Sequence, residues 1–423
     1  MCNFVDLFAY KLKSVQIEIN SNTNNLLRIP IKNLKMGCAN CSGVQTASIT
    51  VSKADLGMHP FRAWLAKTSK SVKAGRFGSG PNCTSPLRIV MGNTSCDVDS
   101  AVGALCLAYY YQLKFNQQWV PVINCRREDF YCNLEIVKHL ANCHISQKDL
   151  YFYDEFRAQF PDPEAISEVA LIDHNELDVE QSDLGRKVTR VIDHHHDSGA
   201  YADQIVEKQC RLIGSACSLV ALMMKQDEAV FAEDLKRPKP NSPNLAYLLA
   251  AAVVLDSYFF KEELRSKKWT EEDEEAHQWL MQYANVDRSY WEQLNNAKFD
   301  VTAGLELGLE GIFIRDYKCY DLPSGFMGVS VSTGSIDTMI KHFGEAKFGS
   351  ACRDYVLKRK LGMFVIVAIQ ASDDGKIEKN IMIFDYHDNP VNCVLKDKKD
   401  SLCALIEGTE DMMLSDKKVL GPE

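Results

Sequence analysis

The chain has 423 residues, more than one compact core usually holds, and its length predicts two or three domains. A hydrophobic fraction of 46% and a charged fraction of 25% exclude the disordered and fibrous classes. The formal net charge is −9 at pH 7 and no long Lys/Arg run occurs, so nucleic acid is disfavoured as the main partner.

The sequence gives no sign of a membrane partner. The start MCNFVDLFAY lacks the basic region and cleavage site of a signal peptide. The longest apolar run, LAYLLAAAVVL at 245–255, is about half the length that crosses a bilayer. The 15 cysteines stand at irregular spacings, which is typical of buried thiols in a reduced compartment, so we expect a cytoplasmic protein with free thiols.

Residues 1–57 are polar, with one plausible strand pair, and we treat them as an N-terminal extension of unknown role. A helix is expected over 58–73. Short apolar runs then alternate with helical stretches. The expected strands are 87–91, 119–123, 169–172 and 188–192, and the expected helices are 101–114 and 128–143. This alternation predicts an α/β domain with a mostly parallel sheet that is covered on both faces.

Helices over 215–226, 244–260 and 270–285 continue this domain, which we expect to span 58–295. Beyond it, strands over 325–333, 363–370 and 380–386 around a helix at 335–360 predict a second, smaller α/β domain over 296–410, followed by a tail at 411–423. Clefts between two such domains are common ligand sites.

Polar motifs follow the apolar runs of the first domain. They are GNTSCDVDS with Asn93, Asp97 and Asp99, DHNE with Asp173, DHHHD with Asp193, His194 and His195, and finally Asp256 after the run at 245–255. The carboxyl ends of parallel strands meet at one edge of a sheet, so these motifs are expected to converge there.

Several carboxylates with an imidazole and no cysteine favour Mg²⁺ or Mn²⁺ over structural zinc. Asp97 and Asp99 could each ligate a different ion, and an aspartate on a neighbouring strand could bridge them. Each motif alone also has a structural interpretation. Asp97 and Asp99 could cap the helix at 101–114, DHNE could be a turn, and Asp256 could be a solvated or capping residue.

In this order and at these separations, the four motifs resemble those of the DHH phosphoesterase superfamily. The segment RDYKCYDLPSGFMGVSVST at 315–333 is similar to the start of the second, DHHA2 domain in its manganese-pyrophosphatase and exopolyphosphatase branch. The resemblance covers about 86–410. It implies a DHH domain followed by a smaller DHHA2 domain, with the active site in the cleft between them.

The resemblance also implies roles for individual residues. Two divalent cations, Mg²⁺ or Mn²⁺, would be held by Asp97, Asp99, Asp173, His194 and Asp256, with Asp173 as the bridge. His195 would face the substrate phosphate, with Asp193 orienting the two histidines. Lys318 would offer a cation to phosphate. Arg315 is a further candidate for substrate binding, with a solvated surface charge as its alternative interpretation.

Asn93 stands where the manganese pyrophosphatases carry a histidine ligand, and this GN...D.DS form resembles the exopolyphosphatases and prune proteins. We therefore expect an exopolyphosphatase that acts on short polyphosphate chains, with Asn93 on the substrate side and with Asp173 and His195 catalytic. An amide oxygen at this position should favour Mg²⁺. Manganese-type inorganic pyrophosphatase, cyclic-nucleotide phosphodiesterase and a prune-like scaffold with protein partners are the alternatives.

Overall fold

The structure is a computed structural model, and the chain divides into two compact units. One unit is Ser52–Lys298, and the other combines Met1–Val51 with Phe299–Glu423. The residues that the structure describes are 26–35, 59–76, 87–236, 243–322, 325–371, 376–385, 413–414 and 418–420.

The unit of residues 52–298 is built on a five-stranded sheet. Its strands are β2 (Leu87–Met91), β3 (Val120–Val122), β4 (Ile166–Ile172), β5 (Val188–Asp193) and β6 (Glu207–Cys210). They lie in the order β3-β2-β4-β5-β6, and every neighbouring pair is parallel. The predicted parallel α/β fold is therefore confirmed, while β6, whose residues EKQC carry little apolar signal, was not predicted.

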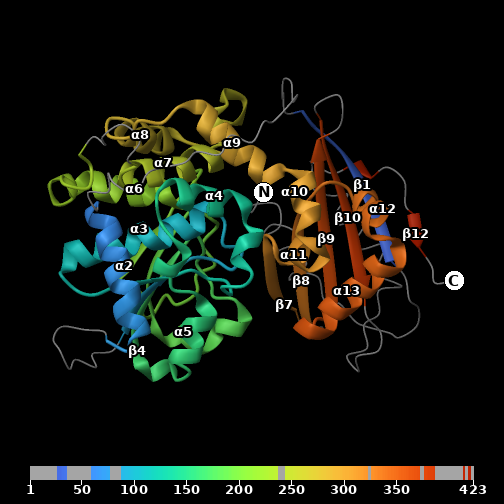
Figure 1. Cartoon of the computed structure of the whole chain (residues 1–423), viewed down its shortest axis with the longest axis horizontal. Helices are drawn as coiled ribbons and strands as arrows, with labels where there is room; N and C mark the ends of the chain where they lie inside the picture. The colour runs from blue at the N-terminus through green and yellow to red at the C-terminus, as the bar shows by residue number, and fades with distance from the viewer. Residues whose placement is uncertain are drawn as a thin grey trace. The chain divides into compact units, whose positions relative to one another are not determined.

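Successive residues of these strands enter two different cores, because side chains alternate across a sheet. Val90 and Ile192 pack with helices α3 (Val98–Phe115), α6 (Ala216–Gln226), α7 (Leu245–Asp256) and α8 (Glu271–Leu280). Ile89 and Val191 pack on the other face with α2 (Pro60–Lys73) and α5 (Tyr153–Gln159). Figure 1 shows α6, α7 and α8 on one side of this unit and α5 on the opposite side. Burial on both faces explains why the strands are almost continuously apolar.

Several helices of this unit differ from their predicted limits. The helix expected over 128–143 is α4 (Leu134–Asn142), preceded by a 3-10 turn. The helix expected over 244–260 ends at Asp256, and Tyr258, Phe259 and Phe260 then adopt left-handed φ values of 53°, 59° and 53°. Such a turn is costly for residues other than glycine, and the apolar pattern gives no hint of it.

The helix expected over 270–285 is α8, which ends at Leu280, and α9 (Arg288–Phe299) follows it unpredicted. Seven 3-10 turns complete the helical elements among the described residues. They are Phe130–Cys132, Gln147–Asp149, Pro163–Ala165, Val179–Lys187, Glu228–Phe231, Tyr258–Phe260 and Glu262–Leu264.

The other unit contains a second sheet. Its strands are β7 (Tyr317–Leu322), β8 (Gly325–Thr333), β9 (Met363–Ala371), β10 (Lys376–Asp385), β1 (Leu26–Lys35), β11 (Met413–Leu414) and β12 (Lys418–Leu420). The order is β11-β1-β10-β9-β8-β7, with β12 also pairing with β1. Only β8 and β9 pair in parallel among these described strands.

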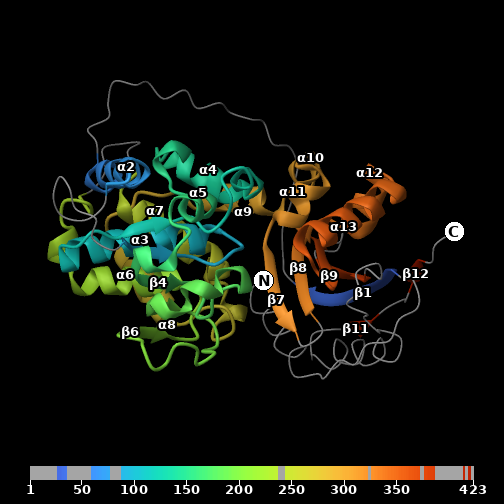
Figure 2. The ribbon, with the colours of Figure 1, turned by 90° about the horizontal axis from the view of Figure 1, so that it is seen from below.

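Helices α10 (Val301–Glu306), α11 (Gly308–Ile314), α12 (Ile336–Phe343) and α13 (Glu345–Arg359) lie on one face of this second sheet, as Figure 2 shows. Phe313 and Phe364 are fully buried in the core between them, with their rings edge-to-face at 5.2 Å. The single helix predicted over 335–360 is broken at Gly344, whose φ of 86° starts a new helix.

β1 comes from the segment that the sequence presented as an extension of unknown role. It pairs antiparallel with β10, in a register that begins at Leu27 opposite Ile383. The partner strand lies far away in the sequence, so local patterns could not identify this pairing.

The nine described cysteines carry free thiols. Among the described helices, none is both long enough and apolar enough to cross a bilayer.

Candidate metal centre

Three of the predicted motifs lie at the carboxyl ends of adjacent strands. Asn93 follows β2, Asp173 follows β4, and Asp193 ends β5. The backbone N–H of Asp173 donates to the carbonyl of Ile192 at 3.0 Å, which continues the β4–β5 pairing to the end of the strands. The predicted convergence of these motifs at one edge of the sheet is therefore present.

Asp173 has an unusual backbone conformation for an aspartate. Its φ is 61°, in the left-handed region, and its side chain is 2% exposed. Cys96, within the first motif, is also left-handed, with φ 53°. Left-handed residues other than glycine tend to occur at functional sites, where the surrounding structure holds the strain.

Asn93 binds Asp173 twice. Its Nδ2 donates to the backbone oxygen of Asp173 at 3.0 Å and to Oδ2 of the same residue at 2.7 Å. Its Oδ1 accepts from the backbone N–H and the hydroxyl of Ser95, at 3.0 and 2.6 Å. Both groups on Asp173 are acceptors, so the orientation of the amide is determined by its partners.

His194 faces two carboxylates. Its Nε2 lies 3.0 Å from Oδ1 of Asp173 and 3.6 Å from Oδ2 of Asp99. Its Nδ1 lies 3.2 Å from the carbonyl oxygen of Ile213, which can only accept, so Nδ1 carries a proton. In a neutral ring Nε2 then offers its lone pair toward the carboxylates, which is the tautomer that ligates a metal through Nε2.

Asp193 holds the loop of three histidines in place. Its Oδ1 accepts from the backbone N–H of His194 and lies 2.8 Å from Nδ1 of His195. Asn175, which the sequence did not single out, donates from Nδ2 to Oδ2 of Asp193 at 2.5 Å and also binds the carbonyl of His196. The expected orienting role of Asp193 thus has matching contacts.

The first motif contributes two carboxylates with different surroundings. Asp97 caps α3 by accepting from the N–H of Ser100 at 3.1 Å, so its capping interpretation also holds. The fully buried Asp99 instead binds a distant turn. It accepts from the hydroxyl of Ser215 and from the N–H groups of Ala216 and Cys217, at 2.6, 2.8 and 2.9 Å.

Asp256 is the last residue of α7, so it reaches the centre from a helix and not from a strand. Lys298, in α9, lies close to the same carboxylates, with its Nζ 3.6 Å from Oδ2 of Asp97. Lys298 was not predicted as a site residue, because a single lysine in the run WEQLNNAKF carries no spacing signal.

The clustered carboxylates shift one another's pKa values. Burial and the charge of Asp99 raise the pKa of Asp173 to about 7. Burial, with Asp99 and Asp97 nearby, also raises the pKa of Asp256 well above its usual range. Burial lowers the pKa of His194, but the neighbouring Asp173 and Asp99 outweigh it and bring that pKa to about 10. This excess of buried negative charge is what a divalent cation would neutralise.

Two sets of side chains place one ligand atom each within 4.8 Å of one another. They are Asp173, His194 and His195, and Asp99, His194 and Asp256. Oxygen and imidazole donors of this kind suit Mg²⁺ or Mn²⁺, so the residues fit the predicted group of metals. Asp97 belongs to neither set, although its charge acts on both Asp173 and Asp256.

The two positively charged side chains predicted to bind phosphate, Arg315 and Lys318, lie in the other unit. Arg315 follows α11 and is 7% exposed, so a solvated surface charge is the wrong interpretation of it. Lys318 lies on β7. Their approach to a substrate phosphate stays a prediction.

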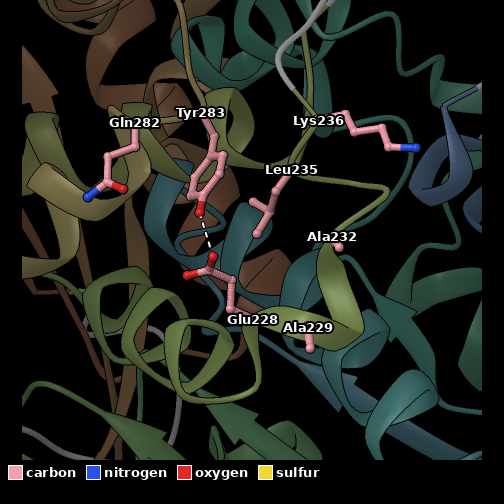
Figure 3. Close-up of a pocket in the computed structure, with 7 residues that line it drawn as sticks. All are labelled: Glu228, Ala229, Ala232, Leu235, Lys236, Gln282 and Tyr283. Atoms are coloured by element: carbon pink, nitrogen blue, oxygen red, sulfur yellow. Dashed lines mark hydrogen bonds between the residues drawn. The ribbon is translucent and has the colours of Figure 1, made fainter.

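A separate cavity of about 440 Å³ lies near α8 and shares no residue with the centre (Figure 3). Tyr283 points its hydroxyl at Glu228, 2.6 Å from Oε1. The indole of Trp279 also donates to this carboxylate, at 2.9 Å. These contacts satisfy the only carboxylate of the lining, so no chemistry is assigned to this cavity.

The stretch that carries most of these motifs is similar to known proteins. Residues 88–253 match the DHH family, N-terminal domain, a stretch that contains Asn93, Asp173, His194 and most of α7. Asp256 lies just beyond it.

Named relatives share part of the chain. "Exopolyphosphatase PRUNE1" of Homo sapiens is 28% identical over 245 residues, which cover 55% of this chain and 49% of that protein. "Probable manganese-dependent inorganic pyrophosphatase" of Listeria monocytogenes serotype 4b (strain CLIP80459) is 30% identical over 139 residues, or 32% of this chain and 41% of that protein. The chain thus spans about half the length of the curated relatives it matches.

Among solved structures, a Methanococcus jannaschii protein assigned to the family II inorganic pyrophosphatases has a TM-score of 0.47 and 20% sequence identity. The match covers 67% of this chain and 84% of that one.

Proposed function

We propose that the chain is a metal-dependent phosphoanhydride hydrolase that removes terminal phosphate from short polyphosphate chains, because residues 88–253 match the DHH family, N-terminal domain, and the chain is similar to an exopolyphosphatase. The observation that carries this proposal is the cluster of the buried Asp99, Asp173 and His194 with the part-buried Asp256. Their charge is unbalanced without a cation, and their donor atoms are those that Mg²⁺ and Mn²⁺ prefer.

We assign the metal ligands as Asp97, Asp99, Asp173, His194 and Asp256. Asp173 would be the bridging ligand, as the resemblance to the DHH phosphoesterase superfamily implies, and a carboxylate has the two oxygens that such a ligand needs. Two divalent cations, when bound, would supply an activated water and neutralise charge on the phosphoryl oxygens.

The protein's own residues have distinct tasks in this proposal. Asn93 holds Asp173 through two hydrogen bonds, and the carbonyl of Ile213 fixes the tautomer of His194. Asp193 orients His195, which binds the substrate phosphate. Lys298 adds a positive charge beside Asp97, a position from which it can attract the anionic substrate. We also assign Lys318 and Arg315 to binding of the substrate phosphate.

Phosphate release from tripolyphosphate, with Mg²⁺ and Mn²⁺ in parallel, tests the proposal. Asp173→Asn should abolish turnover, because it removes a charged ligand while keeping the shape of the side chain. Asp183→Asn is the control, since Asp183 is part-exposed and pairs only with Arg157 among its described contacts. Full activity of Asp173→Asn would overturn the ligand assignment.

A measurement without turnover separates metal binding from substrate choice. Mn²⁺ should raise the melting temperature of the wild type, since only the folded chain gathers these carboxylates. Asp173→Asn should lose most of this stabilisation. If neither Mg²⁺ nor Mn²⁺ changes the melting temperature of the wild type, the metal centre itself is contradicted.

Two other hydrolase activities are tested by the same assay. Likeness to a pyrophosphatase over 139 residues favours pyrophosphate as the second candidate substrate. Cyclic AMP serves as the third, for the phosphodiesterase alternative. A scaffold with protein partners predicts no turnover of any of the three.

The proposal retains the sequence-based domain division. It has a DHH domain at 58–295 and a DHHA2 domain at 296–410, while β1 from the extension at 1–57 and β11 and β12 from the tail at 411–423 add strands to the second sheet. A cytoplasmic place of action also stays a prediction.

A further inference from the structure

We propose that Asp273, on α8, is a positioning residue for the metal centre, because it fixes the turn Gly214–Ser218 that in turn holds the carboxylate of Asp99. This inference rests on the metal centre proposed above. Asp273 lies 174 residues beyond Asp99 in the sequence and belongs to none of the four motifs.

The described hydrogen bonds to the Asp99 carboxylate come from one turn. Oδ1 accepts from the hydroxyl of Ser215 at 2.6 Å and from the N–H of Cys217 at 2.9 Å. Oδ2 accepts from the N–H of Ala216 at 2.8 Å and is the oxygen that lies 3.6 Å from Nε2 of His194. The turn therefore determines which oxygen of Asp99 faces the other ligands.

Asp273 binds the same turn from the other side. Its Oδ2 accepts from the N–H of Gly214 at 2.7 Å. Its Oδ1 accepts from the N–H of Ser215 at 3.3 Å and from the hydroxyl of Ser218 at 2.6 Å. Both Asp99 and Asp273 are fully buried, so neither set of hydrogen bonds competes with water.

Capping of α8 alone does not account for these contacts. The cap uses Thr270, whose N–H and hydroxyl donate to Oδ2 of Asp273 at 2.8 and 3.2 Å. Three further donors come from the 214–218 turn, which belongs to the start of α6. Asp273 thus forms hydrogen bonds at the start of α8 and also at the start of α6.

Gly214 permits this close approach. A Cβ at this position would lie 2.7 Å from the carbonyl oxygen of Lys268 and 3.2 Å from Cγ of Asp273. Any larger residue would push the turn away from Asp273. The turn is therefore held by hydrogen bonds to Asp273 on one side and to Asp99 on the other.

The test compares Asp273→Asn with Asp234→Asn. Asp234 is a matched control, because it is 3% exposed and accepts from the N–H of Phe61 and the hydroxyl of Tyr109, at 3.0 and 2.9 Å, where it anchors α2 and not the centre. Titration with Mn²⁺ alone, followed by calorimetry or by the electron paramagnetic resonance of the free ion, gives the affinity.

Asp273→Asn should weaken Mn²⁺ binding about ten-fold or more, as is typical when a residue behind a metal ligand is changed. Asp234→Asn should lower the melting temperature comparably and leave the affinity unchanged. Saturating Mn²⁺ should restore phosphate release in Asp273→Asn but not in Asp173→Asn.

Wild-type Mn²⁺ affinity in folded Asp273→Asn would overturn the inference. If that variant does not fold, Ser218→Ala decides, since it removes one hydrogen bond and no charge. Weaker Mn²⁺ binding by Ser218→Ala supports the positioning role, and unchanged binding overturns it. A wild type that binds no Mn²⁺ would instead refute the metal centre, so the two failures are distinguishable.

Discussion

Nδ2 of Asn93 lies 2.7 Å from Oδ2 of Asp173 and donates a hydrogen bond to it. With Oδ1 of Asn93 taken by two donors from Ser95, the amide acts on Asp173 more directly than on a cation. The residue that the sequence marked as the departure from the pyrophosphatase pattern is thus tied to the central carboxylate.

Asn93→His should shift activity toward Mn²⁺. An imidazole offers a nitrogen ligand, which Mn²⁺ accepts more readily than Mg²⁺ does. The measurement is the ratio of phosphate release with Mn²⁺ to that with Mg²⁺. Asn93→Ala is the control, because it removes the amide without adding a ligand, and it should lower both rates together. An unchanged ratio in Asn93→His would count against the argument.

Lys298→Gln should raise the KM for tripolyphosphate on the order of ten-fold, because a charged hydrogen bond to phosphate contributes roughly 1.5–3 kcal/mol. Lys225→Gln serves as the control, since Lys225 pairs with the exposed Glu275. Equal KM values for Lys298→Gln and wild type would exclude Lys298 from substrate binding.

His139 should make stability depend on pH. It is fully buried, its Nε2 donates to the carbonyl of Leu248, and its Nδ1 accepts from the hydroxyl of Tyr290, so the neutral ring is fully bonded. Burial lowers its pKa to about 4, from 6.5 in an unfolded chain. The contribution of His139 to the free energy of unfolding is therefore fully present above pH 6.5. It is lost as the pH drops toward 4, because the histidine of the unfolded chain takes up a proton at a higher pH than the histidine of the folded chain does.

The loss amounts to about 3 kcal/mol across that range. His139→Gln cannot take up this proton, so its urea midpoint should fall less than that of the wild type between pH of about 7.5 and about 5.5. If the urea midpoints of the two proteins fall by the same amount between these pH values, the prediction is wrong, whatever the difference between their midpoints at neutral pH.

Lys360→Gly should stabilise the unit that contains α13. Lys360 is the exposed residue after that helix and has left-handed φ and ψ of 54° and 40°, a conformation that glycine adopts without strain. The expected gain is about 1 kcal/mol. Lys358→Gly, inside the same helix, should destabilise it by a similar amount. Thermal unfolding of the three proteins gives the order, and a loss in Lys360→Gly would contradict it.

The parts of the site that the sequence predicted are those at strand ends. Asn93, Asp173 and Asp193 directly follow or end apolar runs, and parallel pairing brings such positions together. Asp256 was grouped with them because it too directly follows an apolar run, and that run is a helix, as expected.

The groups that hold these ligands could not be predicted in the same way. Asn175, the 214–218 turn and Asp273 meet Asp193 and Asp99 only through the tertiary fold, and nothing in their spacing points to a partner. The left-handed turn after Asp256 was missed because aromatic residues do not favour it, so only the surrounding structure can impose it.

The pairing of β1 with β10 has a consequence for how the chain is made. The two strands are separated by roughly 350 residues, and all of Ser52–Lys298 leaves the ribosome between them. The intervening unit can fold before β10 has been synthesised, when β1 is still unpaired. We therefore expect the second sheet to be completed late and slowly. A truncated protein that starts at residue 58 would lack a strand that β10 pairs with, and its newly bared edge would be open to other chains.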